Sequence, residues 1–380
     1  MKIKICHIIT MLELGGAQGN TLYTVSNLDK SMFDAALIAG PGGILDDDAK
    51  KTENIDLYFV PQLVRQVNPI KDIVALFKLR KLLKSIKPDL VHTHSSKAGI
   101  LGRIAAYLAG VPVIIHTFHG FGFNDFQKWF VKFAYVLAER ITAKISDKLI
   151  VVSNENISYG LANRIGRKEQ YMVIRSGIKT GKYRQKFDAV KIKKELGLKE
   201  TDKIITTIGP FKPQKNTVDF IDMAAQVSGK FPDVKFLVIG DGSLRPQIES
   251  KIAAFNLQNK VMLLGWRNDI PELLSITDIF ILTSLWEGLP RAIVESMVSG
   301  KPVIAYAVDG SKEIVKDNVT GFLIPPKNMK VLCEKTMLLL SDDNLRLKFG
   351  MEAQKTVSTE FDIDHMVKQQ ESLYKELVKK

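Results

Sequence analysis

The chain has 380 residues, of which 46% are hydrophobic and 25% are charged, and its formal net charge at pH 7 is +13. This composition excludes a disordered chain, and no apolar run approaches the roughly 20 residues that a membrane-spanning helix needs. The length exceeds one ordinary core, so we expect a globular protein with two domains of about 150–200 residues each.

Basic residues are concentrated in the first half, where residues 1–180 contain 24 Lys and Arg against 15 Asp and Glu. This asymmetry favours an anionic partner there, such as a membrane surface, a phosphorylated lipid or nucleic acid. General solubility explains the same charge equally well. Cys6 and Cys333 lie near opposite ends and give no disulfide framework, which indicates a reducing cytoplasm.

Short apolar runs alternate with helical patterns in the first half, which indicates a parallel sheet covered on both faces. The first residues resemble a signal peptide but lack a small-residue cleavage site, so we expect a buried strand there. The predicted strands are residues 3–10, 35–39, 57–60, 90–92, 113–116 and 148–152. The predicted helices are residues 18–28, 70–86, 97–109 and 127–145. The polar stretch 175–187 is expected to be a linker.

The same alternation restarts after the linker. The predicted strands are residues 203–209, 234–239, 261–264, 279–283, 303–306 and 321–323. The predicted helices are residues 217–230, 245–255, 270–275, 328–340 and one that starts at Pro290. Two doubly wound sheets in series bind ligands at the carboxyl ends of their strands, so we expect the site between the two domains.

Two carboxylates, Glu287 and Glu295, bracket a Gly-Leu-Pro turn between the apolar run 278–286 and a helical pattern. Pro290 fits the first turn of that helix, where its missing N–H costs nothing. Because the start of a helix attracts anions, the pair suits an anionic ligand with hydroxyls, such as a nucleotide sugar. Alternatively, Glu287 is a helix cap and Glu295 a solvated helix residue.

Three further turns follow predicted strands. Gly15 and Gly16 would let the backbone approach a phosphate closely, although no G-x-G-x-x-G fingerprint of dinucleotide binding occurs in the chain. Lys212 and Lys215 could neutralise a diphosphate that gains charge as a bond breaks. The third turn is Gly-Asp-Gly at residues 240–242. Each of the three is equally compatible with an ordinary strand-to-helix turn.

Four histidines lie at predicted strand ends, namely His92, His94, His116 and His119. They suggest a metal site, but no Cys or carboxylate completes one at the usual spacing. We expect instead that they line a polar cleft for an acceptor. Ser95, Ser96 and Lys97 open the next helix and could hold an acceptor phosphate.

Taken in order, these segments resemble the family 4 retaining glycosyltransferases, which have the GT-B fold. They are residues 15–18, 92–103, 119–121, 212–215, 240–242 and 287–295. The resemblance implies two doubly wound, Rossmann-like domains that face each other across a cleft. Residues 1–178 would bind the acceptor and residues 179–356 the nucleotide sugar. Residues 357–380 would form a helix that crosses back to the N-terminal domain.

The resemblance also implies roles for individual residues. The catalytic residues would be His119, Glu287 and Lys215. The donor-binding residues would be Gly16, Lys212, Gly240, Gly242, Arg267, Gly288, Leu289 and Glu295. The acceptor-binding residues would be Gln18, His94, Ser95 and Lys97. Within this set, Glu287 would hold donor-sugar hydroxyls, Glu295 the ribose hydroxyls and Lys215 the leaving diphosphate, while His119 would donate a hydrogen bond to the sugar.

The sequence departs from the family pattern at two positions. The family often has Glu where Gln18 stands, and it usually has Arg directly after the glycine that corresponds to Gly209. Here Pro210 follows Gly209, and Lys212 would substitute for the missing arginine. Lysine is a point charge without the bidentate fork of arginine, so the phosphate geometry would differ.

The function that the resemblance implies is retaining transfer of a hexose from a nucleotide-diphospho-sugar, with UDP as the expected nucleotide. The acceptor would be a glycan or a polyprenyl-diphosphate-linked sugar of surface polysaccharide synthesis, at the cytoplasmic face of the membrane. No cofactor, metal or nucleic acid is expected. Asp46–Asp48 and 362–364 have the D-x-D spacing of metal-dependent glycosyltransferases, but both lie beside predicted helix starts, which favours capping.

Two other functions remain compatible with the sequence. A sugar-nucleotide epimerase of the same fold would share the nucleotide pocket, and a non-catalytic protein that binds anionic lipid would use the basic half. Two basic amphipathic helices, residues 70–86 and 127–145, could lie on an anionic membrane. They could equally well cover the sheet with their apolar sides.

Overall fold

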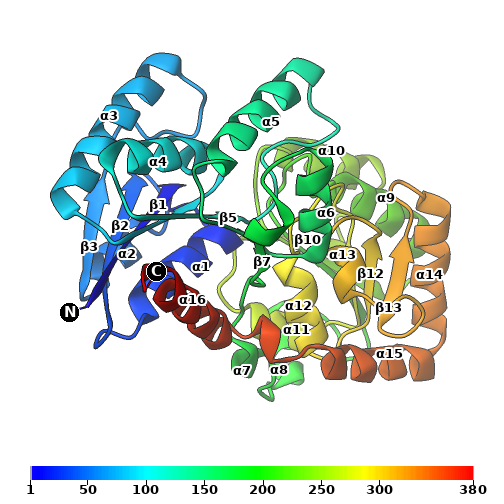
Figure 1. The fold of residues 1–380 in the computed structure, drawn as a ribbon. Coiled ribbons are helices and arrows are strands. Elements are labelled where there is room, and N and C mark those ends of the chain that lie inside the picture. Colours follow the sequence, from blue (N-terminus) through cyan, green and yellow to red (C-terminus); the bar gives the residue numbers. More distant parts are fainter. Residues whose placement is uncertain (1, 380) are drawn as a thin grey trace. The chain divides into compact units, whose positions relative to one another are not determined.

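The computed structural model describes residues 2–379, which form two compact units (Figure 1). The N-terminal unit runs to Gly177 and also contains the segment from Ile363 onward, and the C-terminal unit is Ile178–Asp362. Each unit is a parallel sheet with helices on both faces, which confirms the fold class that the alternating pattern predicts.

Seven parallel strands form the sheet of the N-terminal unit, in the order β3-β2-β1-β4-β5-β6-β7. They are β1 (Ile3–Met11), β2 (Phe33–Gly40), β3 (Ile55–Phe59), β4 (Leu90–His94), β5 (Val113–Phe118), β6 (Lys148–Val151) and β7 (Tyr171–Val173). The strand order reverses between β1 and β4. Open sheets of this kind bind ligands at such a reversal, beside the carboxyl ends of the strands.

Helices α3 (Pro69–Ile86), α4 (Ser96–Ala109) and α5 (Trp129–Ala143) lie on one face of this sheet (Figure 1). Helices α1 (Gly16–Asn27) and α16 (Ile363–Val378) cover the other face. The shorter elements are α2 (Asp46–Lys51), α6 (Asn154–Ala162) and the 3-10 turn η1 (Lys168–Gln170). Leu373 and Tyr374 of α16 share a buried core with Ile5 and Ile9 of β1, so the late helix completes the core of the unit that begins the chain.

Six parallel strands form the sheet of the C-terminal unit, in the order β10-β9-β8-β11-β12-β13. They are β8 (Lys203–Ile208), β9 (Val234–Ile239), β10 (Val261–Gly265), β11 (Ile279–Leu282), β12 (Val303–Tyr306) and β13 (Gly321–Ile324). The helices are α7 (Thr180–Tyr183), α8 (Ala189–Glu195), α9 (Thr217–Ser228), α10 (Arg245–Ala254), α11 (Ile270–Ser275), α12 (Arg291–Val298), α13 (Ser311–Ile314), α14 (Met329–Ser341) and α15 (Asp343–Thr356), with the 3-10 turn η2 (Thr359–Phe361).

The structure differs from the predicted elements in short segments. Helices α2, α6, α7, α8 and α13 and strand β7 were not predicted, because elements of three to nine residues give too little periodicity to recognise. Strand β4 extends to His94, two residues beyond its predicted end. Helix α12 starts at Arg291, because Pro290 keeps an extended backbone with ψ of 94° and forms the cap rather than the first turn. Among the described residues, no helix has both the length and the hydrophobicity needed to cross a bilayer.

Candidate active site

An ion pair between Lys215 and Glu287 lies at the carboxyl ends of β8 and β11. The side chains are largely buried, with 16% of Lys215 and 6% of Glu287 exposed. Glu287 lies four residues before helix α12 rather than at its cap, which excludes the capping alternative. Removing two charges from water costs free energy unless the charges pair with each other. The pairing therefore constrains both side chains to one position.

The loops that carry this pair are tied to each other by hydrogen bonds. The amide of Leu285 donates to the carbonyl of Gln214 at 2.8 Å, and the side-chain amide of Gln214 donates to the carbonyl of Trp286 at 2.9 Å. The hydroxyl of Thr283 donates to the carbonyl of Asn216 at 3.0 Å. The positions of Lys215 and Glu287 are therefore fixed by backbone contacts, and not by the ion pair alone.

The turn before α12 presents backbone N–H groups beside this pair. Within residues 2–379, the amides of Gly288 and Leu289 donate to no backbone oxygen outside the regular elements. The amide of Glu287 donates to the carboxylate of Asp309 at 2.7 Å, which orients the turn. Gly310 packs against this turn so closely that a Cβ would come within 2.2 Å of the Gly288 carbonyl. Such a turn can receive an anion.

Glu295 lies in the second turn of α12, with only 12% of its side chain exposed. The guanidinium of Arg291 lies 3.5 Å from its carboxylate. Burial, and then the nearby Glu295 carboxylate, raise the pKa of Tyr183, which reaches this site from α7. Glu295 is therefore not the solvated helix residue of the alternative interpretation. Tyr183 had no signal in the sequence, because it lies in the predicted linker.

Gly240 and Gly242 form the loop after β9 with backbone angles that favour glycine, with φ of 132° and 155°. A Cβ on Gly240 would come within 2.1 Å of the carbonyl oxygen of Gly209, so the loops after β8 and β9 touch backbone to backbone. Lys212 is partly buried in the first of these loops. Arg267, after β10, is partly exposed and binds Asp269 at 2.8 Å.

In the N-terminal unit, a pocket lies at the carboxyl ends of β1 and β4. It is lined by Thr10, Met11, Glu13, Gln18, Arg65, Ser95, Ser96, Lys97 and Tyr135. Three of the four predicted acceptor residues, Gln18, Ser95 and Lys97, thus come together. The ammonium of Lys97 already binds Asp72 at 2.5 Å, and Arg65 binds Glu13 at 2.9 Å, so each cation of the pocket has an acidic partner.

Ser95 has an unusual backbone, with φ of 61° and ψ of 157°. Its hydroxyl lies 2.7 Å from the hydroxyl of Thr10, which also accepts from the amide of Ala98 at 3.2 Å. A non-glycine residue in such a conformation is maintained only by its surroundings, and such residues cluster at ligand sites. The conformation turns the start of α4 toward this pocket.

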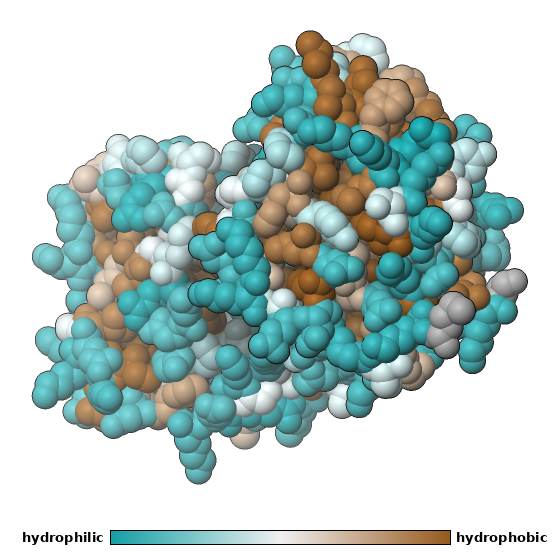
Figure 2. Space-filling model, turned by 90° about the vertical axis from the view of Figure 1, so that its left-hand side faces the viewer, coloured by the Kyte–Doolittle hydropathy of each residue, from teal (hydrophilic) through white to brown (hydrophobic). Residues whose placement is uncertain are grey.

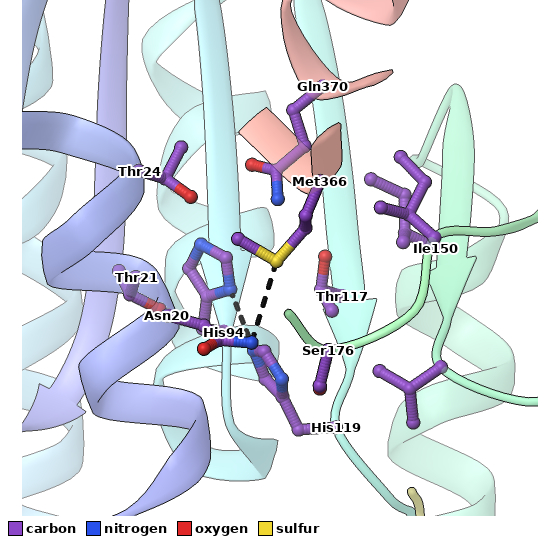
Figure 3. A pocket seen from close by; sticks show the side chains of 12 residues that line it. Asn20, Thr21, Thr24, His94, Thr117, His119, Ile150, Ser176, Met366 and Gln370 are labelled. Atoms are coloured by element: carbon purple, nitrogen blue, oxygen red, sulfur yellow. Dashed lines mark hydrogen bonds between the residues drawn. The ribbon is translucent and has the colours of Figure 1, made fainter. Parts of the chain in front are cut away.

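His94 requires a correction. It is 3% exposed, and its two ring nitrogens are engaged by His7 at 3.0 Å and by His119 at 3.1 Å. Its predicted contact with an acceptor is therefore replaced by support for His119. Both rings line a small cavity with residues of α1 and α16, among them Asn20, Met366 and Gln370 (Figure 3). His116 lies on the opposite face of the sheet, where it packs against Gly99 of α4.

The histidines that come close enough to share a metal ion are not the four that the sequence singled out. They are His7, His92 and His94, which each have a ring nitrogen within 4.8 Å of those of the other two. All six ring nitrogens of this trio have hydrogen-bonding partners. His7 and His94 bond to each other, His7 and His92 approach Tyr374, His92 bonds to Thr117, and His94 bonds to His119. Hydrogen bonding thus accounts for the trio. Three of the D-x-D aspartates also accept hydrogen bonds: Asp46 from the amide of Gly42 at 2.7 Å, Asp362 from the hydroxyl of Thr180 at 2.6 Å and Asp364 from the hydroxyl of Tyr23 at 2.6 Å.

Comparisons with known proteins identify the family of the chain. Residues 14–182 match the family described as Glycosyltransferase Family 4, and residues 188–356 match the one described as Glycosyl transferases group 1. The chain is 36% identical to the UDP-Gal:alpha-D-GlcNAc-diphosphoundecaprenol alpha-1,3-galactosyltransferase of Escherichia coli, over 99% of this chain and 98% of that protein. It is 25% identical to the capsular polysaccharide biosynthesis glycosyltransferase CapM of Staphylococcus aureus, over 99% and 98% of the two chains.

The fold is similar to that of Anabaena Alr3699/HepE, solved in complex with UDP and glucose. The TM-score is 0.85, with 22% identity over 98% of this chain and all of that one. Two matched family segments span both units, and one relative is alike over nearly its whole length. The chain therefore belongs to the family 4 glycosyltransferases and is a hexosyltransferase-type enzyme of the GT-B fold.

Proposed function

We propose that this glycosyltransferase moves a hexose, with retention, from a UDP-hexose to a polyprenyl-diphosphate-linked sugar in surface polysaccharide synthesis. The relative from Escherichia coli supports both substrates, because its name specifies UDP-Gal as donor and a GlcNAc-diphosphoundecaprenol as acceptor. In this chain, the observation that carries the proposal is the buried Lys215–Glu287 pair beside the start of α12.

The donor diphosphate would lie at the start of α12, against the amides of Gly288 and Leu289. Negative charge develops on this diphosphate as the glycosidic bond breaks, and the ammonium of Lys215 would stabilise it. Glu287 would then be oriented toward hydroxyls of the sugar, and Glu295 toward those of the ribose. Because these groups supply the required charge, we expect the reaction to proceed without a metal ion.

Retention follows from attack on the same face of the sugar that the diphosphate leaves. Such a path passes through an oxocarbenium-like state and needs no carboxylate nucleophile. The acceptor hydroxyl would be delivered by the N-terminal unit. Its pocket, with Arg65, Lys97 and the start of α4, suits an anionic diphosphate, and each cation would exchange an acidic partner for a phosphate oxygen.

A lipid-linked acceptor would bring the reaction to a membrane surface, and the N-terminal unit has exposed apolar residues on two helices that both pack against α4. Ile70, Phe77, Trp129, Phe130 and Phe133 of α3 and α5 form what we call the α3–α5 surface. The exposed fractions are 79% for Trp129, 77% for Ile70 and 61% for Phe77. Figure 2 shows hydrophobic side chains gathered with hydrophilic ones on the upper part of the face turned to the viewer. Such a mixture suits the interface of an anionic membrane.

Helix α5 packs on the unit with Val136 and Ala143, which belong to a buried apolar cluster, and with Glu139, whose carboxylate binds the buried Arg103 of α4 at 2.5 Å. Its aromatic residues remain in solvent. These exposed aromatic residues support the alternative of membrane contact. We therefore infer that the enzyme acts at the cytoplasmic face of the membrane.

The test is a panel of UDP-, GDP- and ADP-hexoses, read by thermal shift and by release of nucleoside diphosphate with and without GlcNAc-diphosphoundecaprenol. We expect stabilisation by a UDP-hexose and acceptor-dependent release that persists in EDTA. Glu295→Ala should abolish the stabilisation, whereas Glu352→Ala, at a half-buried position of α15 in the same unit, should not. Turnover of the sugar nucleotide without acceptor would instead support an epimerase, and no stabilisation by any nucleotide would exclude the assigned donor site.

A further inference from the structure

A chain of buried hydrogen bonds leads from His119 to helix α16. His7 of β1 lies opposite His92 of β4 in the strand register, and His94 follows two residues later. In a parallel sheet, such positions point to the same face. This is the face that α16 covers, and Tyr374 of α16 reaches these rings with its hydroxyl.

The chain can be followed atom by atom. His119 Nε2 lies 3.1 Å from His94 Nδ1, and His94 Nε2 lies 3.0 Å from His7 Nδ1. His7 Nε2 lies 3.4 Å from Tyr374 Oη. Tyr374 Oη donates to Gln370 Oε1 at 2.9 Å and lies 2.7 Å from His92 Nδ1. Figure 3 shows His119, His94 and Gln370 around the same cavity.

Three rings of this chain, those of His7, His92 and His94, are neutral. Burial lowers the pKa of His7 to about 3 and holds the pKa of His92 and of His94 well below the usual value. A neutral imidazole has one N–H, so it donates at one nitrogen and accepts at the other. The direction of one hydrogen bond therefore determines the direction of the next.

Tyr374 determines the direction at the inner end of the chain. Its hydroxyl has one proton and two near acceptors, Gln370 Oε1 and His92 Nδ1, both closer than His7. Whichever of the two receives the proton, the tyrosine oxygen still accepts from His7 Nε2–H. His7 Nδ1 then accepts from His94 Nε2–H, and His94 Nδ1 accepts from His119 Nε2–H.

We propose that Tyr374 is a positioning residue that selects the Nε2–H tautomer of His119, so that Nδ1 of His119 is a hydrogen-bond acceptor. The bearing on catalysis rests on the proposed function and on the role that the family resemblance implies for His119, a hydrogen bond with the donor sugar. His119 would accept a hydrogen bond from a sugar hydroxyl, rather than donate one as the sequence suggested. If every hydrogen bond of the chain ran in the opposite direction, each ring would carry its proton on the other nitrogen without any change in net charge. His119 would then present Nδ1–H, a donor, to the sugar.

The tautomer can be read directly from the enzyme without substrate. The chain has six histidines, so long-range ¹H–¹⁵N spectra of the imidazoles can be assigned by single substitutions. We expect wild-type His119 to carry its proton on Nε2 alone. In Tyr374→Phe, His7 loses its acceptor, and His119 should become a mixture of both tautomers. A wild-type His119 protonated on Nδ1 would overturn the proposal.

Two controls separate the tautomer from general damage to the fold. Gln370→Leu removes a buried hydrogen bond from the same helix but leaves His92 to take the tyrosine proton, so His119 should stay protonated on Nε2. Tyr171→Phe removes another buried tyrosine hydroxyl of this unit, bonded to the carbonyl of Ile165 at 2.7 Å, and should also change nothing. A mixture of tautomers in either control would overturn the assignment to Tyr374.

Activity provides the second measurement. In Tyr374→Phe, kcat/KM for the donor should fall in proportion to the fraction of the wrong tautomer, about twofold for an equal mixture. If Tyr374→Phe fails to fold, His7→Phe interrupts the same chain from β1 and should give the same mixture and the same loss. An unchanged Nε2–H tautomer in the interrupted chain would overturn the proposal. A wild-type enzyme inactive with every donor would overturn the proposed function and leave the tautomer result intact.

Discussion

Lys215 and Glu287 neutralise each other in a place where a charged ligand is proposed to bind. The pair is nearly closed to solvent, and its loops are joined by backbone hydrogen bonds. A donor diphosphate would compete with Glu287 for the ammonium, so the carboxylate becomes available to the sugar only when the diphosphate has arrived. The pair can therefore link recognition of the two parts of the donor.

Replacing Lys215 with Met separates catalysis from stability at this pair. Loss of the cation should lower kcat by about 10²–10³-fold, as when other groups that stabilise transition-state charge are removed. The uncompensated Glu287 should lower the free energy of unfolding by about 3 kcal/mol. The double variant Lys215→Met/Glu287→Gln should recover most of that stability, measured in urea, but none of the kcat. Recovery of kcat in the double variant would show that Lys215 has no role beyond pairing.

Strands β1 and β4 place three neutral imidazoles side by side in a closed core. The reason is the strand period of two, which puts His7, His92 and His94 on one face between aliphatic residues. Because burial lowers the pKa of each ring below that of the unfolded chain, acid favours unfolding. Their contribution to stability is complete above about pH 6.5 and is lost as the pH falls below it.

His7→Gln should reduce this dependence on pH by one proton. Between about pH 6 and pH 4.5, the slope of the free energy of unfolding should decrease by roughly 1.4 kcal/mol per pH unit relative to the wild type. Urea unfolding at a series of pH values measures the slope. Thr93→Val, a buried change in β4 that removes no titrating group, should leave the slope unaltered. An unchanged slope in His7→Gln would mean that His7 is already charged in the folded protein.

The sequence predicted the regular elements well but only some of the residues at the candidate site. Alternating apolar runs predicted nearly every long strand and helix, because burial on both faces imposes that pattern. Glu287, Lys215 and Gly240 could be found because they lie in the loops that follow strands. His7 was missed because a single polar residue inside an apolar strand has no signal of its own. Tyr374 and Gln370 were missed because only the packing of α16 against β1 brings residues so distant in sequence together.

The N-terminal unit combines the pocket that contains Arg65 and Lys97 with the α3–α5 surface, and together they would suit the proposed acceptor, which has a charged head and a lipid tail. The excess of basic residues in the first half fits the same partner. The buried ion pair of Arg103 and Glu139 holds α5 on α4, so the exposed aromatic residues are supported by the core beneath them. Membrane binding should therefore need no refolding of the unit.

The variant Trp129→Ser/Phe130→Ser/Phe133→Ser should bind vesicles at least about tenfold more weakly, because each aromatic side chain gains free energy at the interface. Co-sedimentation with vesicles of phosphatidylglycerol and of phosphatidylcholine measures this. Wild-type binding should favour the anionic vesicles and weaken with salt. Leu347→Ser/Met351→Ser, a matched change at exposed apolar positions of α15, should bind as the wild type does. Equal binding by both variants would exclude the α3–α5 surface.

Helix α16 belongs to the core of the N-terminal unit but follows the whole C-terminal unit along the chain. During synthesis on the ribosome, the sheet of the N-terminal unit therefore remains without α16 on one face until about 185 further residues have been translated. The C-terminal unit meets no such delay. A nascent chain interrupted before Ile363 would carry a finished C-terminal unit and an exposed apolar face on the N-terminal unit, which would make it a target for chaperones. Completion of the polypeptide is thereby coupled to completion of the N-terminal unit.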